Sequence, residues 1–117
     1  MSKAKPEIDV AGDSLNITEI NREFRAVAAA NNWQAYHTPK NLAAAVAVEA
    51  SELLAEFQWL TSEDSCALNE QQKTKVADEI ADVIMYLTEL SKRLDINMAD
   101  AVRTKIEKNK QRIQING

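Results

Sequence analysis

The sequence predicts an all-α protein, a four-helix bundle that works as an oligomer. Only two Gly and two Pro occur among its 117 residues, which leaves few turns for a sheet. The β-branched residues are scattered and form no alternating runs, so strands have little support. Apolar residues recur instead at spacings of three and four, the period of helices that pack by one face. A small helical chain buries a modest fraction of its surface alone, so we expect self-association.

The first predicted helix follows a polar segment. Residues 1–15 contain one Pro and one Gly and show no hydrophobic period, so we interpret them as a flexible N-terminal arm. The remaining residues, 16–117, are predicted to form a single helical domain. Asn16 or Thr18 could cap its first helix, which is expected to end near residue 32. The apolar residues that mark this helix are Ile17, Ile20, Phe24 and Val27.

The second predicted helix has a strong start signal. Thr38 offers a hydroxyl group as N-cap, and Pro39 takes the first helical position, where a missing N–H costs nothing. We expect this helix to run to about Trp59. The polar and acidic stretch Ser62–Asn69 is expected to be a loop.

Two further helices complete the predicted bundle. The third is expected over about residues 70–94, where apolar residues share one face. Asn97 and Asp100 resemble a capping box with Asp in the place of Glu, which predicts the start of a fourth helix. Val102 and Ile106 mark the apolar side of this fourth helix.

Charge and cysteine content exclude several classes of function. A formal net charge of −4 argues against a nucleic-acid partner, which needs a concentrated basic surface. It allows a phosphate-bearing small molecule, because a metal can neutralise the phosphate charge. The single Cys66 excludes an intramolecular disulfide and a Cys-based zinc site. No apolar stretch reaches the roughly 20 residues of a membrane span and no secretory signal follows Met1, so we expect a cytoplasmic protein without a membrane partner.

Two acidic pairs border the apolar faces of the second and third predicted helices. At about 100° per residue, Glu49 and Glu52 lie close together on one helix, and Glu79 and Asp82 repeat the arrangement on the other. Antiparallel packing of the two apolar faces would bring the four carboxylates together, where each would raise the pKa of the others. A divalent cation removes this repulsion, and a ligand set made only of oxygens suits Mg²⁺ or Mn²⁺.

Two rival interpretations apply to the acids. Most acidic pairs with this spacing are solvated helix faces, although no Lys or Arg occurs between Asn41 and Gln72 to interleave with them. On that interpretation the chain is a non-catalytic helical oligomer that binds protein partners. A di-iron carboxylate bundle is excluded because it needs Glu-x-x-His on two helices, and the only histidine, His37, precedes the second helix.

The acids and the residues around them resemble a known family. Glu49-x-x-Glu52 followed at a distance by Glu79-x-x-Asp82 is similar to the MazG signature, which is E-E-x-x-E and then E-x-x-D. The chain departs from that signature at Val48, which stands in the place of the first Glu. This departure and the neighbouring residues point to the dCTP pyrophosphatase-like branch, over about residues 17–113. The matching stretches are WQAYHTPKNL at 33–42, EFQW at 56–59, and Lys105-x-x-x-Asn109-x-x-Arg112.

The resemblance implies an all-α fold of the MazG, or all-α NTP pyrophosphatase, type that forms homodimers or homotetramers. It implies Mg²⁺-dependent hydrolysis of a (deoxy)nucleoside triphosphate to monophosphate and pyrophosphate, for nucleotide-pool house-cleaning with dCTP favoured. Alternative substrates for the same reaction are dUTP, dATP and modified nucleotides. By position, the catalytic residues and Mg²⁺ ligands would be Glu49, Glu52, Glu79 and Asp82, with Mn²⁺ as a substitute metal.

Two more groups of residues are candidates for contact with the substrate. Lys105, Asn109 and Arg112 share one face of the fourth predicted helix, and two cations with an amide suit phosphate oxygens. The alternative is a basic last turn that complements the helix dipole. Aromatic faces stack on bases, and Asn can form hydrogen bonds with the edge of a base. Because the aromatic and amide candidates come from a different part of the fold than the acids, the pocket could combine residues of two subunits. The candidates for nucleoside binding are Trp33, His37, Asn41, Trp59 and Tyr86.

Overall fold

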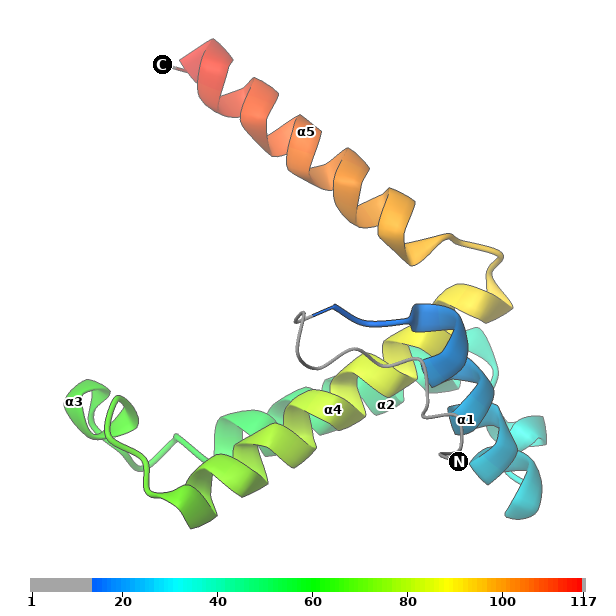
Figure 1. Cartoon of the computed structure of the whole chain (residues 1–117), viewed down its shortest axis with the longest axis horizontal. Helices are drawn as coiled ribbons and strands as arrows, with labels where there is room; N and C mark the ends of the chain where they lie inside the picture. Colours follow the sequence, from blue (N-terminus) through cyan, green and yellow to red (C-terminus); the bar gives the residue numbers. More distant parts are fainter. Residues whose placement is uncertain (1–13, 117) are drawn as a thin grey trace, which may run out of the picture.

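Every regular element is a helix in the computed structural model, which describes residues 14–116, with side chains to residue 113 (Figure 1). The all-α prediction is therefore confirmed for the described chain. Nearly all of the arm expected over residues 1–15 lies outside the described residues. The elements are α1 (Ile17–Ala30), the 3₁₀ turn η1 (Gln34–Tyr36), α2 (Pro39–Ala55), α3 (Ser62–Ser65), α4 (Glu70–Arg93) and α5 (Met98–Asn116).

Helix α1 is bounded by asparagines at both ends. The side chain of Asn16 accepts a hydrogen bond from the backbone N of Glu19 at 2.9 Å, which makes Asn16 the N-cap. At the other end Asn32 has a φ of 59°, and the backbone N of Trp33 donates to Ala28 O at 2.9 Å. Asn tolerates this left-handed conformation better than most residues, so Asn32 favours the end of α1 at this position.

Helices α2 and α4 pack side by side and run in opposite directions (Figure 1). Thr38 caps α2 by accepting a hydrogen bond from the backbone N of Asn41 at 3.2 Å. Asn69 and Gln72 form a capping box at the start of α4, with both hydrogen bonds at 2.8 Å. The expected starts of both helices are confirmed, and the two helices have the antiparallel arrangement that the meeting of the acids requires.

Three local features differ from the expectation. Helix α2 ends at Ala55 rather than near Trp59, and residues 56–59 continue as turns. Thr61 starts the one-turn helix α3 inside the stretch expected to be a loop, by accepting a hydrogen bond from the backbone N of Asp64 at 3.0 Å. Acidic residues in that first turn complement the positive end of the helix. The 3₁₀ turn η1 was not expected, and the described chain has five α-helices instead of four.

Helix α5 projects away from the α2–α4 pair (Figure 1). Its start is capped as expected, because Asn97 Oδ1 accepts a hydrogen bond from the backbone N of Asp100 at 2.9 Å. The preceding turn places Asp95 at a φ of 58° and lets the backbone N of Ile96 donate to Ser91 O at 2.8 Å. Within one chain, the helices therefore do not close into the expected four-helix bundle.

The apolar core of a single chain is small. In the described chain the buried apolar residues are Ile20, Ala28 and Leu42, which lie on α1 and α2. No helix among the described residues is long and apolar enough to cross a membrane. Many large apolar side chains on α2, α4 and α5 remain exposed: Val48, Leu54, Ile80, Val102, Ile106 and Ile113.

Candidate metal centre

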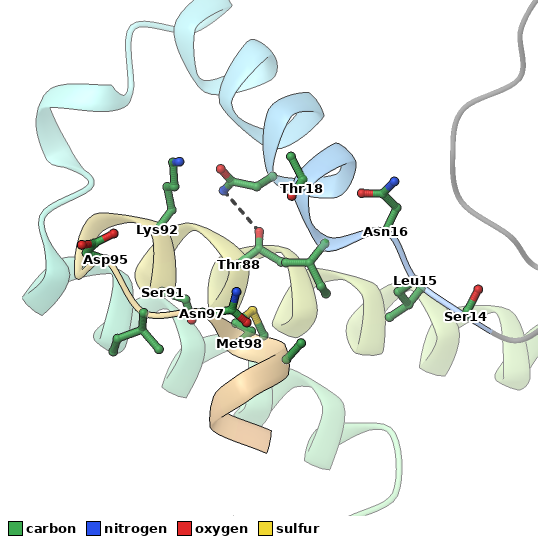
Figure 2. Close-up of a pocket in the computed structure, with 14 residues that line it drawn as sticks. Ser14, Leu15, Asn16, Thr18, Thr88, Ser91, Lys92, Asp95, Asn97 and Met98 are labelled. Atoms are coloured by element: carbon green, nitrogen blue, oxygen red, sulfur yellow. Dashed lines mark hydrogen bonds between the residues drawn. The ribbon is translucent and has the colours of Figure 1, made fainter. Parts of the chain in front are cut away.

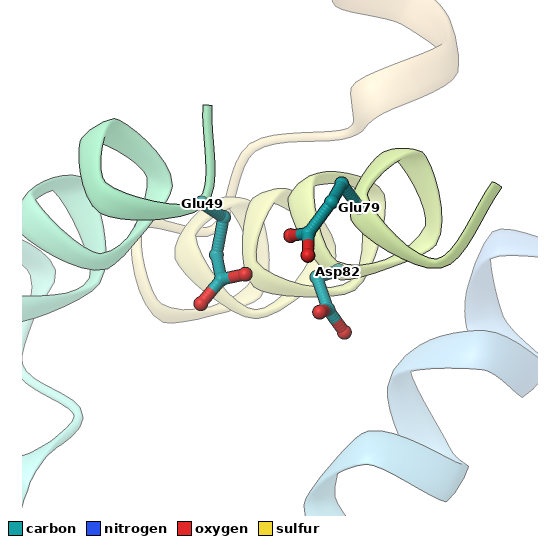
Figure 3. A group of neighbouring side chains, drawn as sticks. All are labelled: Glu49, Glu79 and Asp82. Carbon is teal, nitrogen blue, oxygen red and sulfur yellow. The ribbon is translucent and has the colours of Figure 1, made fainter. Parts of the chain in front are cut away.

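Three carboxylates from two helices meet beside the α2–α4 pair (Figure 3). Glu49 of α2 and both Glu79 and Asp82 of α4 each offer an oxygen, and these oxygens lie within 4.8 Å of one another. The three residues are half-buried. Glu79 and Asp82 share a face because they are three residues apart on a helix, and the antiparallel neighbour α2 brings Glu49 against them.

Without a cation, this cluster is electrostatically unfavourable. The pKa of Glu49 is raised to about 7, first by burial and then by the charges of Glu52, Asp82 and Glu79. Burial also raises the pKa of Glu79, again with contributions from Glu52 and Asp82. The Oε1 atoms of Glu49 and Glu79 are shielded from solvent and have no hydrogen-bond partner in the described chain. Buried acceptors without a partner are costly, so both atoms favour a ligand.

A hard divalent cation fits this donor set. All the available ligand atoms are carboxylate oxygens, which Mg²⁺ and Mn²⁺ prefer. Such a cation would satisfy the unpaired oxygens and remove the repulsion that raises the two pKa values. Glu52 is exposed and lies outside the close group, although its charge acts on Glu49 and Glu79. The structure therefore brings together three of the four predicted ligands and leaves Glu52 at their edge.

An aromatic cluster adjoins the acids. Tyr86 follows Asp82 by one helical turn, and its pKa is raised by burial and by the charges of Glu49 and Asp82. The ring of Phe24 on α1 lies 5.2 Å from that of Tyr86 and 5.5 Å from that of His37, while His37 and Tyr86 are 6.2 Å apart. Two of the predicted nucleoside residues thus lie together. Sequence reasoning placed Phe24 only on an apolar helix face and missed its place in this cluster.

The other nucleoside candidates are positioned differently. Trp59 is 87% exposed and so is largely free of packing within the described chain, whereas Trp33 is 45% exposed and is covered over about half of its surface. The side chain of Asn41 donates to Tyr36 O at 2.8 Å and holds the turn that precedes α2. A role in substrate binding stays a prediction for all three.

The predicted phosphate-binding residues lie on α5. Lys105 and Arg112 are exposed, and Asn109 is half-buried. Because α5 projects away from α2 and α4 (Figure 1), one chain does not bring these side chains to the acidic cluster. The Oδ1 atom of Asn109 is nevertheless shielded from solvent and has no hydrogen-bond partner in the part of the chain described.

A buried ionic network further along α4 was not predicted. Glu89 is 1% exposed and accepts hydrogen bonds from Asn21 Nδ2 at 2.9 Å, Arg25 Nε at 2.7 Å and Arg93 Nε at 2.7 Å. Burial alone would raise the pKa of Glu89, but these hydrogen bonds outweigh it and lower that pKa. Part of this network can be inferred from the sequence, because Glu89 and Arg93 follow Tyr86 at spacings of three and four, which place them on one face of α4.

Two cavities lie on the α1 side of α4. The larger, about 720 Å³, lies between the start of α1, the end of α4 and the turn into α5 (Figure 2). Thr88, which accepts a hydrogen bond from Asn21 at 3.4 Å, stands on its wall. No member of the acidic cluster lines either cavity. The smaller cavity, about 390 Å³, is lined by Arg25, Ala28, Gln34, His37, Glu89 and Arg93.

Known proteins resemble this chain over the region that carries the acids. A model of the MazG-like family matches residues 44–117. The chain is 32% identical to dCTP pyrophosphatase 1 of Rattus norvegicus over 101 residues, which cover 85% of this chain and 59% of that protein. It is 30% identical to dCTP pyrophosphatase 1 of Homo sapiens over 98 residues, with 82% and 58% covered. The chain therefore spans about three fifths of the length of these curated relatives.

A solved structure is similar in both sequence and fold. The crystal structure of a pyrophosphatase from Archaeoglobus fulgidus DSM 4304 matches with a TM-score of 0.76 and 39% sequence identity. The match covers 82% of this chain and 90% of that chain, so it includes most of the helical fold.

Proposed function

We propose that this chain, which belongs to the MazG-like family, is a nucleoside triphosphate pyrophosphohydrolase that uses Mg²⁺. The observation that carries the proposal is the meeting of Glu49, Glu79 and Asp82, whose carboxylate oxygens lie within 4.8 Å of one another. The reaction adds water to a (deoxy)nucleoside triphosphate and releases the monophosphate and pyrophosphate. We favour dCTP as substrate because the curated relatives are named dCTP pyrophosphatase 1.

The chain's own residues provide the position and charge that this reaction needs. Glu79 and Asp82 from one turn of α4, with Glu49 opposite, would hold the metal, and Mn²⁺ would be accepted by the same oxygens. A metal held by these residues would neutralise phosphate charge and would lower the pKa of an attacking water. Glu52, at the edge of the group, is available as a fourth ligand or as the acceptor of a proton from that water.

The substrate contacts extend the proposal to the rest of the site. His37 and Tyr86, with Phe24, form a group of rings next to the acids, and such rings bind planar bases. Trp33, Asn41 and Trp59 remain candidates for the same pocket. We assign the phosphates to three residues of α5, supplied by a second chain: Lys105, Asn109 and Arg112.

Self-association follows from the same features. Three observations favour a homodimer or a homotetramer built as a dimer of dimers. The described chain buries only a few apolar residues, while large apolar side chains on α2, α4 and α5 are exposed. Helix α5 projects from the chain, and Asn109 on it has a shielded oxygen without a partner in the described chain. A neighbouring chain would cover these surfaces and complete the site.

Pyrophosphate release across all NTPs and dNTPs, measured with Mg²⁺, tests the proposal. We expect release from dNTPs, with dCTP the best substrate. A preference for dUTP, dATP or a modified nucleotide would keep the reaction and change the substrate. If no triphosphate yields pyrophosphate, the proposal fails and the acids belong to a non-catalytic helical oligomer that binds protein partners.

A further inference from the structure

The smaller cavity lies on the same face of α4 as the acidic cluster. Glu79, Asp82, Tyr86, Glu89 and Arg93 follow one another at spacings of three and four, so they form one line along the helix. Asp82 and Glu89 are two turns apart, which is roughly 10 Å along the axis. This is the scale of a nucleoside between its 5′ phosphate and the far edge of its base. A triphosphate anchored at the acids can therefore extend its base to the cavity.

The wall of this cavity presents hydrogen-bond donors. Arg25 and Arg93 each bind Glu89 through Nε, at 2.7 Å in both cases. Arg93 Nη2 also donates a long hydrogen bond to Gln34 O at 3.4 Å, which leaves Arg93 Nη1 without an acceptor in the described chain. Within the described chain, the outer nitrogens of Arg25 have no acceptor. The two side chains are 43% and 31% exposed, so Glu89 fixes both guanidinium groups while their outer donors stay accessible.

The size and charge of the cavity suit a planar ring that carries acceptor atoms. A volume of about 390 Å³ lies within the range of small-molecule sites. Two guanidinium groups against the single carboxylate of Glu89 leave one net positive charge and an excess of donors. His37 lines the cavity and also belongs to the ring cluster beside the acids, so it links the two places.

We propose that this cavity receives the nucleobase of the bound triphosphate, and that Arg25 and Arg93 donate hydrogen bonds to acceptor atoms on the edge of that base. The inference rests on the proposed function. Glu89 is a positioning residue, because it acts by holding the two arginines. Cytosine offers two neighbouring acceptors, N3 and O2, whereas uracil carries an N–H donor between its carbonyl groups. A guanidinium fork with two donors therefore favours cytosine over uracil.

The test compares conservative variants on substrates with and without a base. Arg25→Lys and Arg93→Lys keep the positive charge next to Glu89 but remove the planar fork. Glu89→Gln keeps the shape and loosens the hold on both arginines. Arg22→Lys is the matched control, because Arg22 is an exposed residue of the same helix α1 that pairs with Glu19. The measured quantities are kcat and KM for dCTP, dUTP and 1,2-dideoxyribose 5-triphosphate, which lacks a base.

We expect Arg25→Lys, Arg93→Lys and Glu89→Gln to raise KM for dCTP about tenfold, with little change in kcat. The preference for dCTP over dUTP should shrink, and kcat/KM for the base-free triphosphate should stay at the wild-type value. Arg22→Lys should change none of these constants. Thermal melts establish that each variant is folded.

Two results would overturn the inference. An unchanged KM for dCTP in the arginine variants would show that they do not touch the base. An equal loss on the base-free triphosphate would show that they contact phosphate or act only through stability. The proposed function is tested separately by the wild type: without pyrophosphate release from any triphosphate it fails, whereas an active wild type with indifferent variants rejects the inference alone.

Discussion

Glu49 and Asp82 hold carboxylate oxygens within 4.8 Å of each other although they stand on different helices. Their proximity depends on the packing of α2 against α4, since the unfolded chain separates them. Like charges at this distance oppose folding unless a cation lies between them. The pair therefore links the fold to the proposed chemistry, and both can be tested by changing the charge of the cluster.

Neutral substitutions in the cluster should remove most of the turnover. Glu49→Gln, Glu79→Gln and Asp82→Asn each delete a charge at nearly constant volume, and we expect kcat to fall by about a hundredfold or more. Glu52→Gln should act in the same direction. The measurement is steady-state pyrophosphate release at saturating Mg²⁺, with Glu70→Gln at the exposed start of α4 as control. A variant with near wild-type kcat would not carry a ligand of the metal.

Mg²⁺ should stabilise the folded chain at neutral pH. The cation binds the assembled cluster and not the unfolded chain, so it raises Tm by mass action. The double variant Glu49→Gln/Glu79→Gln should melt above wild type in EDTA, because its repulsion is gone, and should lose most of the response to Mg²⁺. Thermal melts in EDTA and in millimolar Mg²⁺ check this. Equal responses of wild type and double variant would mean that the acids are a solvated face.

The metal-free stability should depend on pH in a direction fixed by Glu49. Its folded pKa of about 7 lies above the ordinary value of 4.5, so the folded state binds the proton more tightly. The destabilisation is complete above pH 7 and eases as the pH falls from 7 towards 4.5. In EDTA, the Tm of wild type should therefore lie below that of Glu49→Gln at pH 8 and approach it as the pH is lowered to 5. A constant difference across this range would contradict the raised pKa.

The stability contributed by Glu89 should depend on pH in the opposite direction to that of Glu49. Its folded pKa is lowered, so it contributes stability above pH 4.5 that is lost as the pH falls through the folded pKa. Glu89→Ala leaves Arg25 and Arg93 without their shared partner. Because both arginines can still reach solvent, we expect it to reduce the free energy of unfolding by about 1.5–3 kcal/mol, the scale of charged hydrogen bonds. Glu70→Ala, on an exposed turn, should change it by less than about 0.5 kcal/mol. Urea denaturation measures both, and a loss below about 1 kcal/mol for Glu89→Ala would contradict the network's role.

Assembly should depend on the apolar side of α5. Ile106 is 46% exposed in one chain, and burying it against a second chain would exclude a charge at that position. Ile106→Asp should therefore shift the protein towards monomer and lower its activity. Gln111→Asp adds the same charge to an exposed polar position of the same helix and should leave the assembly intact. Sedimentation velocity at micromolar concentration measures the oligomeric state of wild type and both variants. A wild type that is active as a monomer would contradict both the proposed oligomer and the proposed shared site.

Local sequence signals predicted most of the helices. The caps at Asn16, Thr38 and Asn97 depend on residues within one turn, so they can be read directly from the chain. The end of α2 at Ala55 has no Gly or Pro to mark it. The position of α5 depends on contacts beyond a helix's own sequence, and no local signal could show that it leaves the other helices.

In the candidate site, too, the sequence predicts what local spacing determines and not what depends on the packing of separate helices. The spacing of Glu79 and Asp82 is a property of one helix, and the two acidic pairs together predicted the cluster that Glu49 completes. The contact of Glu89 with Arg25 could not be foreseen, because it requires the register of α1 against α4. The same register places Phe24 against Tyr86 and His37, which is why the sequence suggested the rings but not their grouping.

The products of dCTP hydrolysis test the central claim most directly. ³¹P NMR of wild type with dCTP and Mg²⁺ should show dCMP and pyrophosphate accumulating together, and Asp82→Asn or EDTA should abolish both signals. Release of inorganic phosphate with dCDP, or unchanged hydrolysis by the folded Asp82→Asn protein, would contradict the account of a metal-dependent pyrophosphohydrolase at Glu49, Glu79 and Asp82.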